Sequence, residues 1–234
     1  MKNLQFIFLG CFLVLSSVLT AQKNRVEYLP NFDKHPFHYG FYLGINQNDF
    51  KLDYKESNYS NTALIKVAPT LGFNVGLIAD MRLHKNINLR FEPGLTSNSK
   101  TIAFSHINSK KDSIREIGST YLRIPLVVKF STDRMDNVKP YVLAGLSYNY
   151  NFSSNEKNPD DNASGEFRMK THSFMYEVGI GIDLYLYFFK FSPSIRGVFA
   201  LNNELKYDTD SNSKWTSPIK FLGTRGVFLN FSFE

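Results

Sequence analysis

The chain of 234 residues carries 27 Lys and Arg against 21 Asp and Glu, and it contains 22 Phe and 13 Tyr. Its basic residues are scattered, which argues against a nucleic-acid-binding arm, so we expect no nucleic-acid partner. Aromatic residues favour β-strands, and Tyr is also common at membrane interfaces.

Residues 1–21 predict a signal peptide. Lys2 precedes an apolar run from Leu4 to Leu19, and a small-residue cleavage site follows at positions 20–22. Two alternatives stay open: residues 8–11 resemble a lipidation box, and the run could be a retained anchor, although it is short for a spanning helix. Cys11 is the only cysteine, so the exported chain is expected to lack disulfides. Residues 22–36 have no strand pattern and predict an N-terminal segment in the periplasm.

The rest of the chain alternates apolar and polar residues with a period of two. Beyond the first 21 residues no stretch holds 18 consecutive apolar residues, so helical membrane spans are not expected. Each alternating segment has roughly the 9–11 residues that a tilted strand needs to cross a bilayer. The pattern predicts eight strands, at residues 37–45, 71–80, 87–95, 122–130, 141–148, 176–184, 189–199 and 227–233.

Short and long connections alternate between these strands. The short ones are 82–86, 131–138 and 185–188, and the long, polar ones are 47–66, 97–119, 151–172 and 202–218. Transmembrane barrels have short periplasmic turns and long extracellular loops. We therefore expect an all-β fold over residues 37–234, an eight-stranded antiparallel up-and-down transmembrane barrel in the outer membrane, with both termini in the periplasm and lipid around it.

Alternation alone also fits a soluble barrel or sandwich whose apolar face lies inside. The polar face decides between them because it is rich in glycine, which suits the narrow interior of an eight-stranded barrel better than a solvated exterior. Those glycines are Gly40, Gly44, Gly72, Gly76, Gly94, Gly145, Gly179 and Gly181. Tyr39, Tyr148, Tyr150, Tyr176 and Trp215 are candidates for the belts of aromatic residues at the membrane interfaces.

The same polar face carries charges of both signs, which predict a polar network in the lumen. Its members are Asp80, Arg90, Glu92, Arg123, Lys129, Glu177, Asp183, Lys190 and Arg196. We interpret the network as a structural set of ion pairs; a proton or ion path is the alternative. A porin is excluded because eight strands leave little room for an aqueous channel.

Motifs for chemistry are absent from the sequence. It has no phosphate loop, dinucleotide-type glycine motif, nucleophile elbow or histidine pair at metal spacing, so we expect no catalytic residue, cofactor, metal or small-molecule substrate. One enzymatic alternative is a lipid-modifying hydrolase with His172, Ser173 and Glu177 at the barrel rim. Adjacent strand residues point to opposite faces, which disfavours that triad.

Several segments are similar to one family. Residues 25–33 (Arg-Val-Glu-Tyr-Leu-Pro-Asn-Phe-Asp) and 36–41 (Pro-Phe-His-Tyr-Gly-Phe) resemble the start of the PorT (SprT) family of Bacteroidota. Residues 89–94, 121–126 and 139–145 also resemble that family, and they resemble outer-membrane barrels in general.

This resemblance implies a role in the type IX secretion system, which exports proteins across the outer membrane and is linked to gliding motility in some members. It brings no catalytic residues, so it implies a scaffold or accessory that contacts other secretion proteins. The candidate partner-binding segment is Tyr28, Leu29, Pro30, Asn31, Phe32 and Asp33. An adhesion or envelope-stability barrel, whose long loops meet the outside, remains the alternative.

Overall fold

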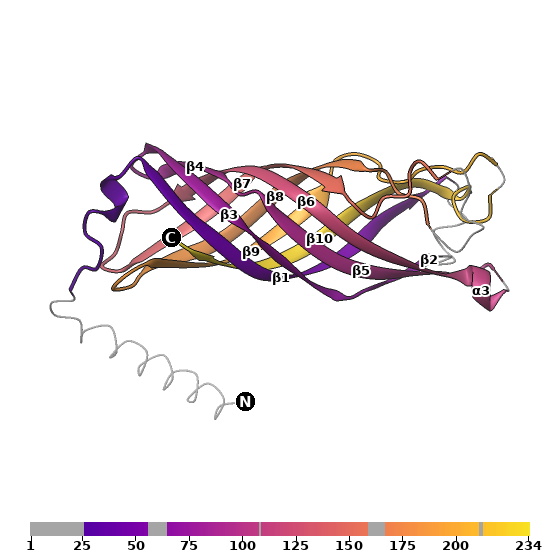
Figure 1. Cartoon of the computed structure of the whole chain (residues 1–234), viewed down its shortest axis with the longest axis horizontal. Helices are drawn as coiled ribbons and strands as arrows, with labels where there is room; N and C mark the ends of the chain where they lie inside the picture. Colours follow the sequence, from indigo (N-terminus) through magenta and orange to yellow (C-terminus); the bar gives the residue numbers. More distant parts are fainter. Residues whose placement is uncertain (1–25, 56–64, 108, 159–166, 211–212) are drawn as a thin grey trace, which may run out of the picture.

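The computed structural model describes residues 26–55, 65–107, 109–158, 167–210 and 213–234, and it is built almost wholly of antiparallel strands (Figure 1). The strands are β1 (Phe37–Tyr54), β2 (Ile65–Pro69), β3 (Leu71–His84), β4 (Ile87–Phe91), β5 (Gly94–Phe104), β6 (Ile114–Ser131), β7 (Val138–Asn151), β8 (His172–Tyr185), β9 (Lys190–Ala200) and β10 (Ile219–Phe233). Two short helices, η1 (Phe32–Lys34) and α3 (Lys110–Ser113), complete the described elements. Within these ranges no helix has the length and apolar character needed to cross a membrane.

The strands close into a ring of eight. β1 pairs with β10 on one side and with β3 on the other, so the sheet returns on itself. β2 and β3 form one wall strand interrupted at Thr70, and β4 and β5 form another interrupted at Glu92 and Pro93, where proline has no N–H to donate. All eight predicted strands are therefore present, and the expected antiparallel barrel is confirmed.

We call the two ends of the barrel the turn end and the loop end. Short connections at 85–86, 132–137 and 186–189 define the turn end, where the first described residues and the C-terminus also lie (left in Figure 1). The longer connections, which include α3, define the loop end.

The outer wall of the turn-end half is apolar. Outward side chains of β1 from Phe37 to Ile45 are at least 47% exposed, and the same holds for Val142 on β7, the strand opposite β1 in the ring, at 51%. We call this surface the apolar band; its members include Phe37, Tyr39, Phe41, Leu43, Ile45, Leu71, Phe73, Leu77, Phe91, Leu95, Leu126, Phe130, Val142, Leu146, Phe174, Val178, Ile180, Ile195 and Val227. Inward positions on the same strands are mostly glycines and polar residues, with a few buried apolar side chains such as Ile78, Val127 and Leu143 among them. Tyr42 fills the space above Gly76 and Gly94.

The strands run further toward the loop end than the sequence pattern indicated. Residues 47–54, 97–104 and 114–119 were expected in loops, but they are strand. The reason is that the two faces exchange polarity there: on β1 the inward residues become Phe50, Leu52 and Tyr54, and the outward ones become Asp49 and Lys51. A search for strands with one consistently apolar face stops where the faces change places.

The loop end has a small apolar core inside the barrel. It comprises Phe50, Ile65, Ile102, Phe104, Ile117, Phe167, Met169, Leu205, Ile219 and Leu222. Trp215 packs against this core, and its indole N–H donates to the main-chain oxygen of Asp112 at 3.0 Å. Its assignment to an interfacial belt was therefore wrong: the residue lies in a loop that closes the end of the barrel.

Replacing Leu205, which is fully buried in this core, by alanine should destabilise the loop end by about 2–5 kcal/mol because it leaves a cavity. Hydrogen exchange should quicken around residues 102–104, 167–169 and 219–222, while the turn-end half stays protected. Leu201→Ala, at a position 55% exposed, is the matched control. Equal exchange in both variants would show that this core does not hold the loop end together.

Candidate functional site

The nine charged residues singled out from the sequence all point into the barrel at its turn-end half. Each is at most 5% exposed. They come from β3, β4, β6, β8 and β9 and from Glu92 between β4 and β5. Their ion pairs therefore reach across the interior of the barrel as well as along its wall.

Arg90 is the central cation of this network. Its Nε lies 3.3 Å from Oδ2 of Asp80 and 3.2 Å from Oε1 of Glu92. Glu92 in turn accepts two hydrogen bonds from the guanidinium of Arg196 on β9, on the far side of the lumen. Bidentate, charge-assisted hydrogen bonds of this kind fix the relative orientation of the two side chains and are stronger than hydrogen bonds between neutral groups.

Two further pairs extend the network between β6 and β8. Arg123 Nη2 donates to Oε1 of Glu177 at 2.5 Å, and Lys129 Nζ contacts both oxygens of Asp183, at 2.8 and 2.6 Å. β7 lies between these two strands in the sheet, so each pair passes over the inner face of β7. The side chains thereby occupy the space in which a channel would run.

Glu234 is a member of the network that sequence reasoning missed. Its carboxylate lies 3.0 Å from Nη2 of Arg90 and 3.0 Å from Nζ of Lys190, and its main chain pairs with Lys190 in both directions. It adds a fifth carboxylate to the four predicted ones, against five cations. The alternation of β10 carried the signal, because Ser232 faces inward and so the next inward position is Glu234.

Along the barrel toward the loop end, the ion pairs are followed by a layer of amide side chains, and this layer is followed by the apolar core of the loop end. Asn74 donates to Oδ1 of Asn230 at 2.7 Å, and Asn46 reaches Asn74 at 3.4 Å. From turn end to loop end the lumen thus passes from paired charges through amides to hydrocarbon. This arrangement is suited to holding a barrel closed and rigid.

The candidate partner-binding segment, residues 28–33, folds back against the turn end. Phe32 stacks on the ring of His38 at 4.2 Å, and Nε2 of His38 donates to the main-chain oxygen of Phe32 at 2.8 Å. Asp33 accepts a hydrogen bond from the hydroxyl of Tyr185 at 2.7 Å and lies 3.7 Å from Nζ of Lys139. We call residues 26–36 the N-terminal cap.

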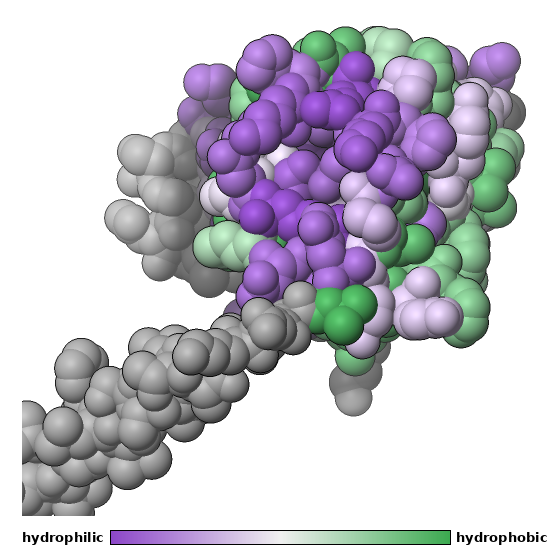
Figure 2. All heavy atoms as spheres, turned by 90° about the vertical axis from the view of Figure 1, so that its left-hand side faces the viewer, coloured by the Kyte–Doolittle hydropathy of each residue, from purple (hydrophilic) through white to green (hydrophobic). Residues whose placement is uncertain are grey.

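Arg134, in the turn between β6 and β7, holds the other half of the cap. Its guanidinium donates to the main-chain oxygens of Tyr28 and Leu29 and stacks on the ring of Tyr185 at 3.8 Å. Asn137 in the same turn accepts from the main-chain N–H of Tyr28 at 2.8 Å. The turn end as a whole is hydrophilic in its centre and is flanked by hydrophobic residues of the wall (Figure 2).

The geometry does not assemble the hydrolase triad considered from the sequence. His172 is exposed on the outer wall, where its Nδ1 bonds the hydroxyl of Tyr148 at 2.6 Å. Ser173 points inward, and Glu177 is engaged with Arg123. In the described ranges, moreover, no group of three or more His, Cys, Asp or Glu residues is placed to hold a metal ion.

Replacing Glu92 by glutamine removes one charge from a buried, balanced set. We expect a loss of about 3–5 kcal/mol, because Arg196 and Arg90 are then left partly uncompensated. Urea unfolding of the barrel in lipid vesicles, followed by the shift between folded and unfolded bands on a gel, measures the loss. Glu92→Gln combined with Arg196→Met should recover part of it. Glu116→Gln, on the exposed outer wall, is the control, and a Glu92→Gln barrel as stable as this control would contradict the role of the network.

Arg134→Ala should release the N-terminal cap without unfolding the barrel, since it removes two hydrogen bonds to main-chain oxygens of the cap and leaves the strand pairing of β6 and β7 intact. Hydrogen exchange of the amides in residues 28–35 should rise strongly, while the amides of β6 and β7 remain protected. Lys85→Ala, at an exposed site in another turn of the same end, should leave the cap protected. Unchanged exchange in Arg134→Ala would mean that other contacts hold the cap.

Comparison with known proteins gives a family for the chain. The family model described as outer membrane protein beta-barrel domain matches residues 20–206. No curated protein matches the chain.

The chain is also similar, at low sequence identity, to several solved structures. Neisserial surface protein A is 13% identical, with a TM-score of 0.43 over 82% of this chain and 95% of its own. Outer membrane protein OprG of Pseudomonas aeruginosa is 13% identical, with a TM-score of 0.45 over 84% of this chain and 91% of its own. Ail, the attachment invasion locus protein of Yersinia pestis, is 11% identical, with a TM-score of 0.38 over 83% of this chain and 96% of its own. With a family match over most of its length, the chain belongs to the outer membrane protein beta-barrel domain family and is an outer-membrane β-barrel protein.

Proposed function

We propose that the chain is a non-catalytic accessory of the type IX secretion system, a closed barrel that presents a structured surface at its turn end. The observation that carries this proposal is the N-terminal cap. Its Asn31-Phe32-Asp33 motif belongs to the segment that resembles the PorT family, and in the structure Phe32 and Asp33 are fixed to His38 and Tyr185 of the barrel.

The docked cap changes the mechanism expected from the sequence. We expected residues 28–33 to contact partners directly, whereas their main chain and the Phe32 and Asp33 side chains are occupied by the barrel itself. The partner surface is then composite: it joins the exposed part of the cap to the neighbouring turns. Tyr28 packs edge-on against Tyr187 at 5.9 Å, and Phe188 beside it is 84% exposed. Tyr187 and Phe188 therefore project from the turn end, and exposed aromatic side chains of this kind are frequent anchors in protein interfaces.

We place the turn end in the periplasm. This orientation is supported by the short connections at that end and the long ones at the other, which is the arrangement of transmembrane barrels. A surface on the periplasmic side can meet cargo and machinery before export. The paired charges in the lumen support a scaffold rather than a conduit, because they fill the interior of the barrel.

A secretion assay in the native host tests this proposal. Deleting the gene should retain type IX cargo inside the cell, and the full chain should restore its release, as measured by quantitative mass spectrometry of the medium. A chain lacking residues 22–36 should insert in the outer membrane without restoring secretion, because the composite surface is incomplete.

Arg134→Ala separates two ways in which the cap can act. It keeps every residue of the cap but removes its main anchor, so a docked cap predicts impaired secretion, and Lys85→Ala should secrete normally. If cargo reaches the medium normally in the deletion strain, the type IX assignment is wrong. If Arg134→Ala secretes normally while the chain lacking residues 22–36 does not, the cap acts as a free peptide and the composite surface is wrong.

The adhesion alternative rests on the loop end, which extends the barrel beyond the apolar band as a rigid, polar-walled projection with its own core. Protease treatment of intact cells, followed by adhesion and secretion assays, separates the two functions. Loss of adhesion with intact secretion would favour this alternative.

A further inference from the structure

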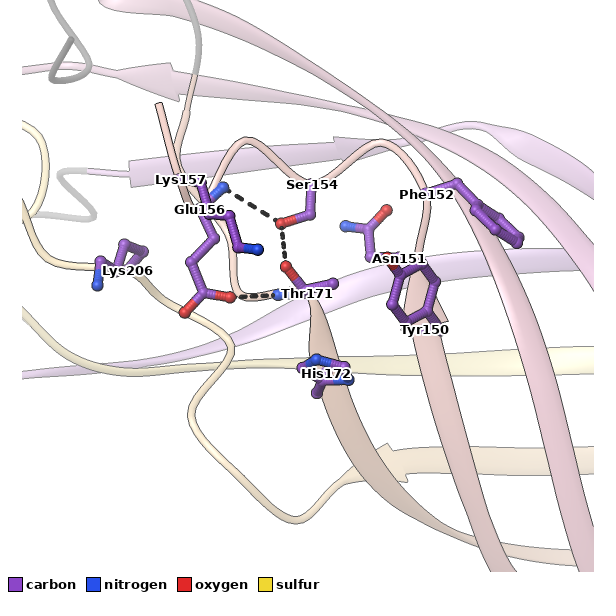
Figure 3. A pocket seen from close by; sticks show the side chains of 9 residues that line it. All are labelled: Tyr150, Asn151, Phe152, Ser154, Glu156, Lys157, Thr171, His172 and Lys206. Atoms are coloured by element: carbon purple, nitrogen blue, oxygen red, sulfur yellow. Dashed lines mark hydrogen bonds between the residues drawn. The ribbon is translucent and has the colours of Figure 1, made fainter. Parts of the chain in front are cut away.

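A groove of about 730 Å³ opens on the outside of the barrel where β7 ends and β8 begins (Figure 3). It lies between the segment that follows β7, the residue that precedes β8 and the connection between β9 and β10. Its lining residues are Tyr150, Asn151, Phe152, Ser154, Glu156, Lys157, Thr171, His172 and Lys206. It is separate from the lumen network and the N-terminal cap, and neither role described above uses it.

The aromatic side of the groove continues into the apolar band. Tyr150 packs against Phe152 at 5.2 Å and against His172 at 5.4 Å, and Tyr148 below contacts Phe174 at 5.6 Å. Phe152 and Phe174 are 57% and 54% exposed. An unbroken aromatic surface thus leads from the groove down the part of the wall that faces lipid.

The other side of the groove is cationic and rich in hydroxyl groups. Lys157 and Lys206 approach it from two different connections, and the hydroxyls of Ser154 and Thr171 contact each other at 2.9 Å in its wall. Among the described residues that line the groove, Glu156 is the one carboxylate, and it is already held, since its Oε2 accepts the main-chain N–H of Thr171 at 2.8 Å. This hydrogen bond lowers the pKa of Glu156. Two ammonium groups outweigh one fixed carboxylate, so the groove favours an anion.

We infer that this groove binds the phosphate-bearing headgroup of a membrane lipid, with its acyl chains lying on the apolar band below. The cations and the aromatic surface meet at the boundary between the polar and apolar parts of the wall, which is where a lipid places its phosphate. Lysine is a common ligand for phosphate, as a point charge. A soluble phosphate would use only the cationic side, so the exposed aromatic rings favour the lipid.

Native mass spectrometry of the full barrel, refolded in detergent micelles, tests this inference. Dioleoyl phosphatidic acid is the probe, dioleoyl phosphatidylcholine is its zwitterionic counterpart, and inorganic phosphate is a competitor. Wild type should retain one phosphatidic acid. The double variant Lys157→Gln/Lys206→Gln should bind it about tenfold more weakly, a factor that corresponds to ~1.4 kcal/mol, and Lys66→Gln/Lys220→Gln, which removes two exposed lysines outside the groove, should bind it as wild type does.

The aromatic rings provide a second readout. Phe152→Ser/Phe174→Ser should weaken phosphatidic acid binding while leaving any competition by inorganic phosphate unchanged. The inference is overturned if the groove double variant binds like wild type, or if its loss is matched by the control double variant. It is also overturned if inorganic phosphate displaces the lipid at comparable concentration, because the site would then take free phosphate.

Discussion

The two faces of a closed sheet in a membrane meet different surroundings, lipid outside and the packed interior of the barrel inside. The need to match both governs the structure. Backbone groups are paired around the ring, so the side chains alone must match the surroundings on each face. Outside, the match is hydrocarbon against lipid. Inside, the charges are withdrawn from water and must compensate one another, since an unpaired buried charge costs several kcal/mol. The five cations and five carboxylates around Arg90 and Glu92 meet that condition.

The exchange of polarity toward the loop end follows from the same requirement. Beyond the apolar band the outer wall bears residues such as Asp49, Lys51 and Arg225, and Arg225 pairs with Asp49 at 2.8 Å. The interior of that half is then free to be apolar, and it forms an ordinary hydrophobic core around Ile102, Leu205 and Ile219. One set of strands therefore forms a barrel with a polar interior at one end and a barrel with an apolar interior at the other.

Much of the barrel could be predicted from the sequence because alternation is a local signal. The eight strands and the inward direction of residues such as Arg90 and Glu177 follow from a period of two. The strand ends at the loop side could not be found in this way, since the alternation persists through Phe50 but its sign reverses. Trp215 was misplaced because the sequence does not distinguish an interfacial aromatic from one that packs inside a loop.

The candidate site was predictable in part. Its charged residues lie on strands and share a face, whereas Glu234 lies past the last recognised strand. The docking of the N-terminal cap depends on hydrogen bonds from Arg134 to main-chain oxygens, and main-chain acceptors have no sequence signature. Function is therefore best approached through the surface that the cap and the turns form together, which only the three-dimensional arrangement reveals.

The exchange of the two faces along the barrel is the central claim, and the environment of one strand tests it most directly. Cys11 is the only cysteine in the sequence, so a chain produced without residues 1–21 has none. Single-cysteine variants of that chain at outward positions 41, 43, 45, 49 and 51 of β1 can carry a nitroxide label in lipid bilayers. The account predicts relaxation by oxygen, which concentrates in lipid, at 41 to 45 and relaxation by a water-soluble nickel complex at 49 and 51. Lipid-like relaxation at all five positions, or water-like relaxation at 43, would contradict it.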